Sequence, residues 1–220
     1  MIPAQAANYE KFENAGVDPE KAADLTKILN DLKPEDEKET VSLNQKILAI
    51  DRSKLSDEEK VEAISALVPD KRERLVEAGV SDRNARDIAA ELAIAEAENG
   101  DEELSYLQKA SLMIYQTSDD EEALAAVSTV LQESTYEKVE LANSYGVPVE
   151  YWVDYREAWQ EAYGEDSVSQ EKVEHVLDGM MLSDSQKAVL WQIANKSWKP
   201  KNNPYDKWIG EEIYDELNEE

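Results

Sequence analysis

Few side chains in this sequence are of a type that could do chemistry. The chain has one histidine and no cysteine. His175 lies near Glu171 and Glu174, a grouping that could serve a zinc ion or act as a general base. A single histidine without any cysteine argues against a zinc cage. We therefore expect His175 to be an ordinary, partly exposed side chain.

Three acid-rich loops, at 34–39, 98–103 and 165–166, could attract Ca²⁺, which prefers oxygen ligands. None of them has the alternating aspartate frame that ends on a glutamate at the twelfth position. Around Gly100 of the second loop, the preceding positions where ligands would stand hold Ala95 and Ala97. We favour solvated caps for the helices that follow these loops, and we expect neither a metal nor a cofactor.

No segment carries the pattern of a catalytic site. The sequence lacks a G-x-S-x-G elbow, a P-loop and a dinucleotide fingerprint, and without cysteine it has no thiol nucleophile. Carboxylates are so frequent that spacing singles out no glycosidase-type pair. We expect a protein that is not an enzyme.

The formal net charge is −27, because the chain has 50 acidic and 23 basic residues. A chain this acidic is not expected to bind phosphate backbones or anionic lipid, so charged partners should be basic. Basic residues gather at Lys71, Arg72 and Arg74, with Arg83 and Arg86 in the next expected helix. For these we favour internal pairing with acids over a nucleic-acid site.

The N-terminal segment lacks the basic and apolar regions of a signal peptide, and no run approaches the roughly 18 apolar residues that span a bilayer. We expect a soluble protein that does not bind membranes and that is intracellular or released by lysis.

One phrase occurs three times, as "NAGVDPEKA" at 14–22, "EAGVSDRNA" at 77–85 and "SYGVPVEYW" at 144–152. Aligning the copies on their glycines gives periods of 63 and 67 residues, room for about four helices each. The glycines are Gly16, Gly79 and Gly146. Each is predicted to end a helix in the left-handed conformation, which glycine adopts cheaply. Asp18 and Ser81 are predicted to cap the helix that follows, whereas the third copy offers only Pro148.

In each copy, a serine followed three residues later by Glu or Gln is predicted to begin the last helix. These serines are Ser56, Ser118 and Ser183, and each is predicted to form a capping box. Apolar residues between such signals fall at helical spacing, as in Leu25, Ile28, Leu29 and Leu32, and in Ile88, Ala89, Leu92 and Ala95. No segment alternates convincingly as a strand.

The sequence therefore predicts an all-α, solenoid-like protein built from three stacked repeats of about four helices each. A unit of short amphipathic helices cannot bury its apolar surface alone, so stacked copies would bury it against one another. We place the repeats at 1–69, 70–134 and 135–198, and a C-terminal capping arm at 199–220.

Four aromatic residues form one stripe on the helix after Gly146: Trp152, Tyr155, Trp159 and Tyr163. By distance from the repeat glycine, Tyr155 and Trp159 occupy core positions. Trp152 matches Ala22 and Ala85, and Tyr163 matches Lys33 and Glu96. A repeat core does not require these positions to be large, so something further should cover Trp152 and Tyr163. Either the arm, through Trp208, Ile209 and Ile213, or another protein would do so, and we favour the arm.

The segment "EDSVSQEKVEHVLDGMMLSDSQKAVLWQIAN" at 165–195 resembles the helical repeats in the C-terminal regions of phage and prophage tape measure and minor structural proteins. The matching positions are Ser169 and Lys172, then Leu182, Ser183, Gln186 and Lys187. "LSDEEK" at 55–60 keeps the end of the pattern, and "TSDDEE" at 117–122 loses its lysine. The resemblance implies a virion or assembly setting and supplies no catalytic residues.

The resemblance and the charge together favour a non-enzymatic structural or interaction protein, virion-associated or in the host cytoplasm. It would act as an acidic helical scaffold for a protein partner with a basic or apolar face, without binding nucleic acid directly. The alternative is a soluble antagonist whose acidic surface imitates DNA and occupies a basic DNA-binding protein.

Overall fold

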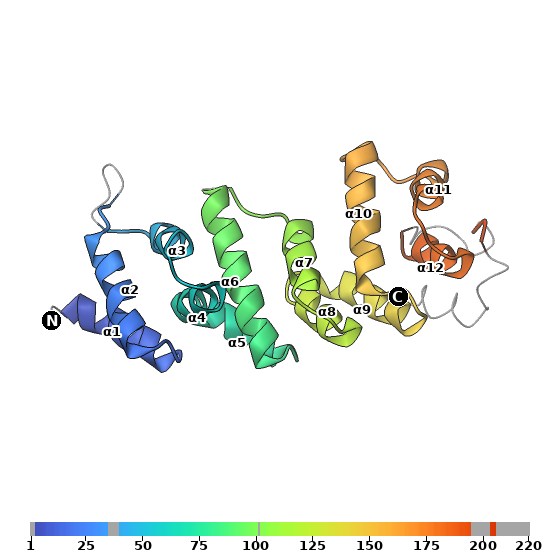
Figure 1. The fold of residues 1–220 in the computed structure, drawn as a ribbon. Coiled ribbons are helices and arrows are strands. Elements are labelled where there is room, and N and C mark those ends of the chain that lie inside the picture. Colours follow the sequence, from blue (N-terminus) through green and yellow to red (C-terminus); the bar gives the residue numbers. More distant parts are fainter. Residues whose placement is uncertain (1–2, 35–39, 101, 195–202, 206–220) are drawn as a thin grey trace. The chain divides into compact units, whose positions relative to one another are not determined.

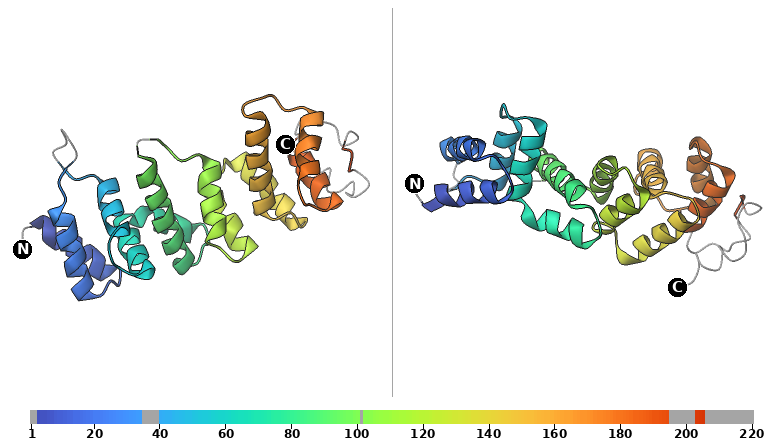
Figure 2. Two further views of the ribbon diagram at one scale, coloured as in Figure 1. Left: turned by 45° about the horizontal axis from the view of Figure 1, so that its top comes forward. Right: turned by 60° about the horizontal axis from the view of Figure 1, so that its bottom comes forward.

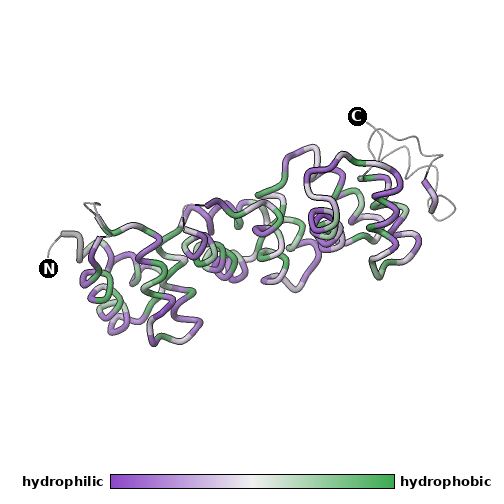
Figure 3. Tube along the Cα trace, turned by 90° about the horizontal axis from the view of Figure 1, so that it is seen from above, coloured by the Kyte–Doolittle hydropathy of each residue, from purple (hydrophilic) through white to green (hydrophobic). Residues whose placement is uncertain are grey.

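The computed structural model describes residues 3–34, 40–100, 102–194 and 203–205, and these residues form helices and no strand (Figure 1). The all-α fold predicted from the sequence is confirmed. Hydrophobic and hydrophilic positions follow one another along each helix, as amphipathic helices require (Figure 3). The chain divides into two compact units, residues 1–117 and 118–220.

The first unit contains seven helices among its described residues. They are α1 (Pro3–Asn14), α2 (Pro19–Asp31), α3 (Leu43–Asp51), α4 (Asp57–Leu67), α5 (Pro69–Glu77), α6 (Asp82–Asn99) and α7 (Tyr106–Tyr115). The long helix α6 packs against α3, α4 and α5, and Figure 2 shows it beside them. The core of this unit therefore lies around α6.

The second unit contains five helices among its described residues. They are α8 (Asp120–Ser128), α9 (Glu133–Ser144), α10 (Val149–Tyr163), α11 (Gln170–Gly179) and α12 (Asp184–Ala194). Helix α10 packs against α9 and α11, and α12 packs against α9 and α11.

Along the sequence the helices form successive groups of four, α1–α4, α5–α8 and α9–α12. Helix α5 begins at Pro69 and α9 at Glu133, just before the positions 70 and 135 where the second and third repeats were predicted to begin. The boundary between the two units, after Thr117, falls inside the predicted second repeat at 70–134. Each junction between repeats lies within one unit: α4 packs against α5 and α6 in the first, and α8 against α9 and α10 in the second. The stacking of all three repeats into one solenoid remains a prediction.

The repeated glycines end α1, α5 and α9 in the conformation predicted for them. Their φ angles are 92° at Gly16, 106° at Gly79 and 79° at Gly146. In each copy the valine after the glycine donates its N–H to the carbonyl five residues earlier, and the glycine donates to the carbonyl three residues earlier. This pair of bonds is the Schellman motif, which satisfies carbonyls left over at a helix end.

The same motif buries an apolar contact. Val17 and Val80 are each 3% exposed and Val147 is 1% exposed. The residues that accept their N–H bonds, Phe12, Leu75 and Ala142, are also buried. The Gly-Val pair therefore both ends a helix and fixes where the chain enters the core.

Two of the three predicted capping boxes are present. The N–H of Ser56 donates to Glu59 Oε2 at 2.9 Å, and the N–H of Glu59 donates to Ser56 Oγ at 3.4 Å. Ser183 and Gln186 exchange the same two bonds at 3.1 and 3.3 Å.

The prediction for Ser118 is wrong, because Asp119 is the residue that caps α8. Its carboxylate accepts from the N–H groups of Glu121 at 3.0 Å and Glu122 at 3.1 Å, and Ser118 lies one residue outside the cap. A carboxylate at a helix N-terminus also gains from the helix dipole. Asp119 lies 40 residues after its repeat glycine, as Ser56 does, whereas Ser118 lies 39 residues after it.

The third helix of the first two repeats also starts with a capping box, which we did not predict. Ser42 pairs with Gln45 to begin α3, and Ser105 pairs with Gln108 to begin α7. The expectation that the acidic loops cap these helices is therefore wrong for α3 and α7. Asp18 and Ser81 cap α2 and α6 as predicted, and Pro148 caps α10 without a side-chain bond.

The core positions predicted by helical spacing are largely correct. Leu25, Leu29, Ile88, Ala89, Leu92, Tyr155 and Trp159 are buried. Ile28, Leu32 and Ala95 are half-buried, at the edges of their apolar stripes.

Candidate protein-binding surface

An acidic cluster lies where α3, α4 and α6 meet. It comprises Asp51 at the end of α3, Asp57 at the start of α4, and Asp87, Glu91 and Glu98 on α6. α6 packs against both α3 and α4, so carboxylates far apart in the sequence come together. Asp57 and Glu98 are exposed and the others are half-buried.

The carboxylates of this cluster affect the ionisation of Glu91. Burial raises the pKa of Glu91, and repulsion from Asp51, Asp87, Asp57 and Glu98, in that order, raises the pKa further. A carboxylate among like charges is harder to ionise because each neighbour disfavours the charged form. The cluster is therefore a region of concentrated negative charge at a fixed place on the first unit.

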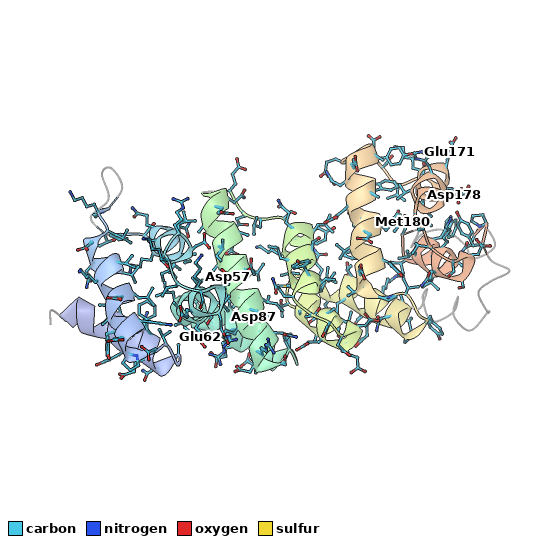
Figure 4. All side chains as sticks on the ribbon, in the orientation of Figure 1. Asp57, Glu62, Asp87, Glu171, Asp178 and Met180 are labelled. Atoms are coloured by element: carbon cyan, nitrogen blue, oxygen red, sulfur yellow. The ribbon has the colours of Figure 1, made fainter. Side chains whose placement is uncertain are left out.

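One arginine partly balances the edge of the cluster. Arg86 approaches Glu62 Oε1 and Asp87 Oδ1, each at 3.4 Å. Figure 4 labels Asp57, Glu62 and Asp87, which gather where α4 and α6 meet. One guanidinium lies among several carboxylates here, so the negative charge is only partly neutralised.

Three of the five basic residues that were considered for a nucleic-acid site pair with acids, as the sequence predicted. Lys71 Nζ lies 2.8 Å from Glu96 Oε2. Arg72 donates to both oxygens of Asp82, at 2.6 and 2.7 Å.

Three further basic positions complete this comparison. Lys21 of α2 pairs with Glu59 of α4. Arg74 and Arg83 are exposed. Lys71, Arg72 and Arg86 are each paired with an acid of the same unit. The five basic residues considered for a nucleic-acid site therefore do not form one basic patch.

In the second unit, α10 carries a smaller acidic group. Burial raises the pKa of Asp154, and the neighbouring Glu150 and Glu157 raise the pKa further. Two of the unit's lysines pair with acids: Lys172 with Asp166 at 2.9 Å, and Lys187 with Asp178 at 3.7 Å. Negative charge is thus concentrated on both units.

His175 is exposed, as predicted, and its ring interacts with Tyr163. Tyr163 Oη and His175 Nδ1 are 2.7 Å apart, and the two rings meet edge to face at 5.9 Å. No group of three or more possible metal ligands occurs among the described residues.

Trp152 and Tyr163 differ in their surroundings. Trp152 is 6% exposed, and its counterparts Ala22 and Ala85 in the other repeats are fully buried, so this position belongs to the core in every copy. Tyr163 is half-buried; its ring lies 5.1 Å from that of Trp159, and Lys172 Nζ lies 5.1 Å from the Tyr163 ring centre. Helices α10 and α11 therefore provide contacts for Tyr163 without the arm.

Trp208 and Ile209, the predicted docking residues of the arm, lie outside the described residues. Within 199–220 the structure describes 203–205, where Asn203 is 3% exposed. Asn203 is bonded to Ala188 of α12 and Tyr205 to Asp178 of α11, and the sequence alone indicated neither contact. The sequence Asn-Pro-Tyr at 203–205 indicates a turn, but it does not indicate which helices the turn contacts.

Comparison with protein-family models, curated proteins and solved structures gives no match. The resemblance to tape measure repeats therefore remains a prediction. Within the described part of the chain, no helix combines the length and apolar character needed to cross a bilayer.

Proposed function

We propose that this protein is a non-enzymatic structural or interaction component, virion-associated or in the host cytoplasm, that acts as an acidic helical scaffold for a protein partner. A phage or prophage origin is the setting that the tape measure resemblance favours. The partner surface would be basic, with apolar side chains among its charges.

The observation that carries this proposal is that basic side chains of the first unit are paired with acids, whereas several carboxylates remain gathered in one cluster. Lys71, Arg72 and Arg86 are engaged by acids of their own unit, while carboxylates collect where α3, α4 and α6 meet. Charge held on rigid helices steers a basic partner and fixes its orientation. Capping boxes and Schellman motifs at successive helix ends support a scaffold, because they hold each helix to a defined length.

The alternative is an acidic antagonist that imitates DNA and occupies the site of a basic DNA-binding protein. The net charge of −27 favours this alternative as well. The two functions differ in how strongly binding depends on ion release. A DNA mimic would occupy a site made for phosphates, so salt and duplex DNA would compete with it steeply.

The distinguishing experiment measures binding of the full chain to its recovered partner as salt rises to about 0.5 M, with and without duplex DNA. The scaffold proposal expects binding to be retained and DNA to have no effect. Steep loss with salt together with displacement by DNA would establish the alternative.

Matched variants locate the binding surface. Asp51→Asn combined with Glu98→Gln removes two charges from the cluster at positions that cap no helix. Glu73→Gln combined with Glu77→Gln removes two exposed charges from α5. We expect weaker partner binding from the first pair only; equal binding by both pairs would place the surface elsewhere.

A further inference from the structure

Two large apolar side chains are exposed at the same place in the first two repeats. Leu43 is 46% exposed and Tyr106 is 38% exposed. Each is the first residue of the third helix of its repeat, α3 or α7, and each stands 27 residues after its repeat glycine, Gly16 or Gly79. The third helix of the third repeat, α11, begins instead with the exposed Gln170. The fold therefore accepts a polar residue at this place, and burial in a core does not explain Leu43 and Tyr106.

Hydrogen bonds around the two helix starts hold these side chains in fixed positions. The capping boxes that begin α3 and α7 enclose them, with bonds between 2.8 and 3.2 Å. Gln45 of the first box also donates its Nε2 to the carbonyl oxygen of Lys33, just after the end of α2, at 3.0 Å. Asn99 Nδ2 donates to the carbonyl oxygen of Glu102, in the turn before α7, at 2.8 Å. A surface that is already ordered loses less entropy when a partner binds.

Both residues lie at one edge of the first unit. Helices α3 and α7 each pack against α6, and the left view of Figure 2 shows them beginning at the edge where α6 ends. Packed helices lie about 8–10 Å apart, so the axes of α3 and α7 are within about 20 Å of each other. We call this place, where Leu43 and Tyr106 flank the end of α6, the apolar edge.

Exposed carboxylates accompany the apolar edge. Glu98 lies in the last turn of α6, Glu102 and Glu103 lie in the turn that leads to α7, and all three are exposed. Lys46 and Lys109, the fourth residues of α3 and α7, are half-buried. Glu98 also belongs to the acidic cluster of α3, α4 and α6, so the edge continues into that cluster. A complementary partner surface combines apolar side chains with basic ones.

We propose that the apolar edge is the docking site for a basic amphipathic segment of the partner protein. The apolar side chains of this segment contact Leu43 and Tyr106, and its basic side chains contact Glu98, Glu102 and Glu103. The docking site rests on the proposed acidic scaffold and adds the apolar contacts that such a scaffold needs. About 12 residues of helix span about 18 Å, so one helical segment reaches both apolar residues. A second copy of the chain fits less well, because two chains with a net charge of −27 repel each other.

The test compares the binding of two synthetic peptides to the full chain by fluorescence anisotropy. One is a helical peptide of about 18 residues with lysines on one face and leucines on the other, and the second has serine in place of every leucine. Leu43→Gln combined with Tyr106→Gln gives both positions the residue type that begins α11. Val76→Gln combined with Tyr115→Gln is the matched control. These two residues are 42% and 85% exposed and lie away from the edge, near the end of α5 and at the end of α7.

We expect the original chain and the control variant to bind the leucine peptide at least about tenfold more tightly than the serine peptide. The Leu43→Gln, Tyr106→Gln variant should bind the two peptides alike, with the helix content of the original chain by circular dichroism. An unchanged preference for the leucine peptide in this variant would overturn the docking site but not the acidic scaffold. Binding of neither peptide by the original chain would contradict the proposed function as well. Self-association of the original chain that this variant loses would make a second copy the occupant and overturn the proposal.

Hydrogen exchange of the original chain gives a readout that needs no variant. The leucine peptide should slow exchange of the amides that begin α3 and α7, those of Gln45 and Gln108 among them, and leave α5 unchanged. Unchanged exchange at both helix starts under saturating peptide would show that the peptide binds elsewhere and would also overturn the proposal.

Discussion

The backbone N–H of Val147 donates to the carbonyl oxygen of Ala142 at 3.1 Å, across a turn in which Gly146 has a φ of 79°. Val80 is bonded to Leu75 in the same way at 3.0 Å. This conformation is strained for residues with a Cβ atom, so the identity of the glycine controls how the two flanking helices are joined.

Substituting Gly146 should therefore cost stability for a purely backbone reason. A Cβ atom at Gly146 would meet no other atom within 4 Å, so crowding is not the cause. Gly146→Val should lower the free energy of unfolding by about 1–2 kcal/mol or more, and Gly146→Asn should cost less, because Asn tolerates positive φ. Urea unfolding followed by circular dichroism measures both. Gly79→Val, at a φ of 106°, should likewise lower stability. A valine variant as stable as the original chain would show that the glycine has no such role.

Asp119 and Ser118 provide a direct test of the corrected helix cap. Asp119→Ala removes the acceptor for two backbone N–H groups of α8 and should destabilise the second unit by about 1 kcal/mol. Ser118→Ala is the neighbouring control and should change stability by less than about 0.5 kcal/mol. Thermal melts of both variants compare the two positions, and a larger loss from Ser118→Ala would restore the serine as the cap.

The local features of the fold were predictable because they depend on short-range chemistry. Each repeated Gly-Val pair ends a helix, and Ser56 and Ser183 each form a capping box, as the sequence indicates. Each of these features depends only on residues at its own helix end. Ser118 was wrong because two adjacent residues could both act as caps, and only where α8 begins decides between them. The boundary between the two units depends on contacts between distant segments, which no local motif reports.

Glu91 should destabilise the folded protein when it is ionised. Its pKa is raised in the folded state, first by burial and then by the carboxylates around it, so the charged form is less favourable than in the unfolded chain. Above the ordinary carboxyl pKa this costs stability, and below it Glu91 is protonated in both states and the cost disappears. Glu91→Gln should therefore raise the melting temperature near pH 7, and the gain should vanish as pH falls below the ordinary carboxyl range.

Glu73→Gln, an exposed change on α5, is the control for this pH series. It should leave the melting temperature nearly unchanged across the same range. If Glu91→Gln behaves like the control at neutral pH, the repulsion assigned to the cluster is absent.

Added salt near neutral pH should raise the melting temperature. The net charge of −27 makes repulsion the dominant long-range force in the compact state, and mobile ions screen it. Differential scanning calorimetry from about 20 to 300 mM salt measures the trend. A steady fall over this range would mean that ion pairs such as Arg72–Asp82 contribute more than the repulsion does.

The candidate surface was only partly predictable. Composition established that it would be acidic, and the sequence predicted that Arg72 and Arg86 would each pair with an acid four residues away. They do pair with acids, but Asp82 lies ten residues from Arg72 and Glu62 lies 24 residues from Arg86. The cluster around Glu91 could not be located, because Asp51, Asp57 and Glu91 belong to three helices that meet only in the folded unit. Tyr163 has contacts on α11, from Lys172 and His175, that spacing along α10 alone did not indicate.

Quantitative mass spectrometry of purified phage particles, from the strain that encodes this chain, tests the proposed function most directly. The account predicts that the protein is present at a fixed number of copies per particle and remains after a wash with high salt, as expected of a structural component. Its absence from the particles, with the protein recovered instead on a basic DNA-binding protein from which duplex DNA displaces it, would contradict the account.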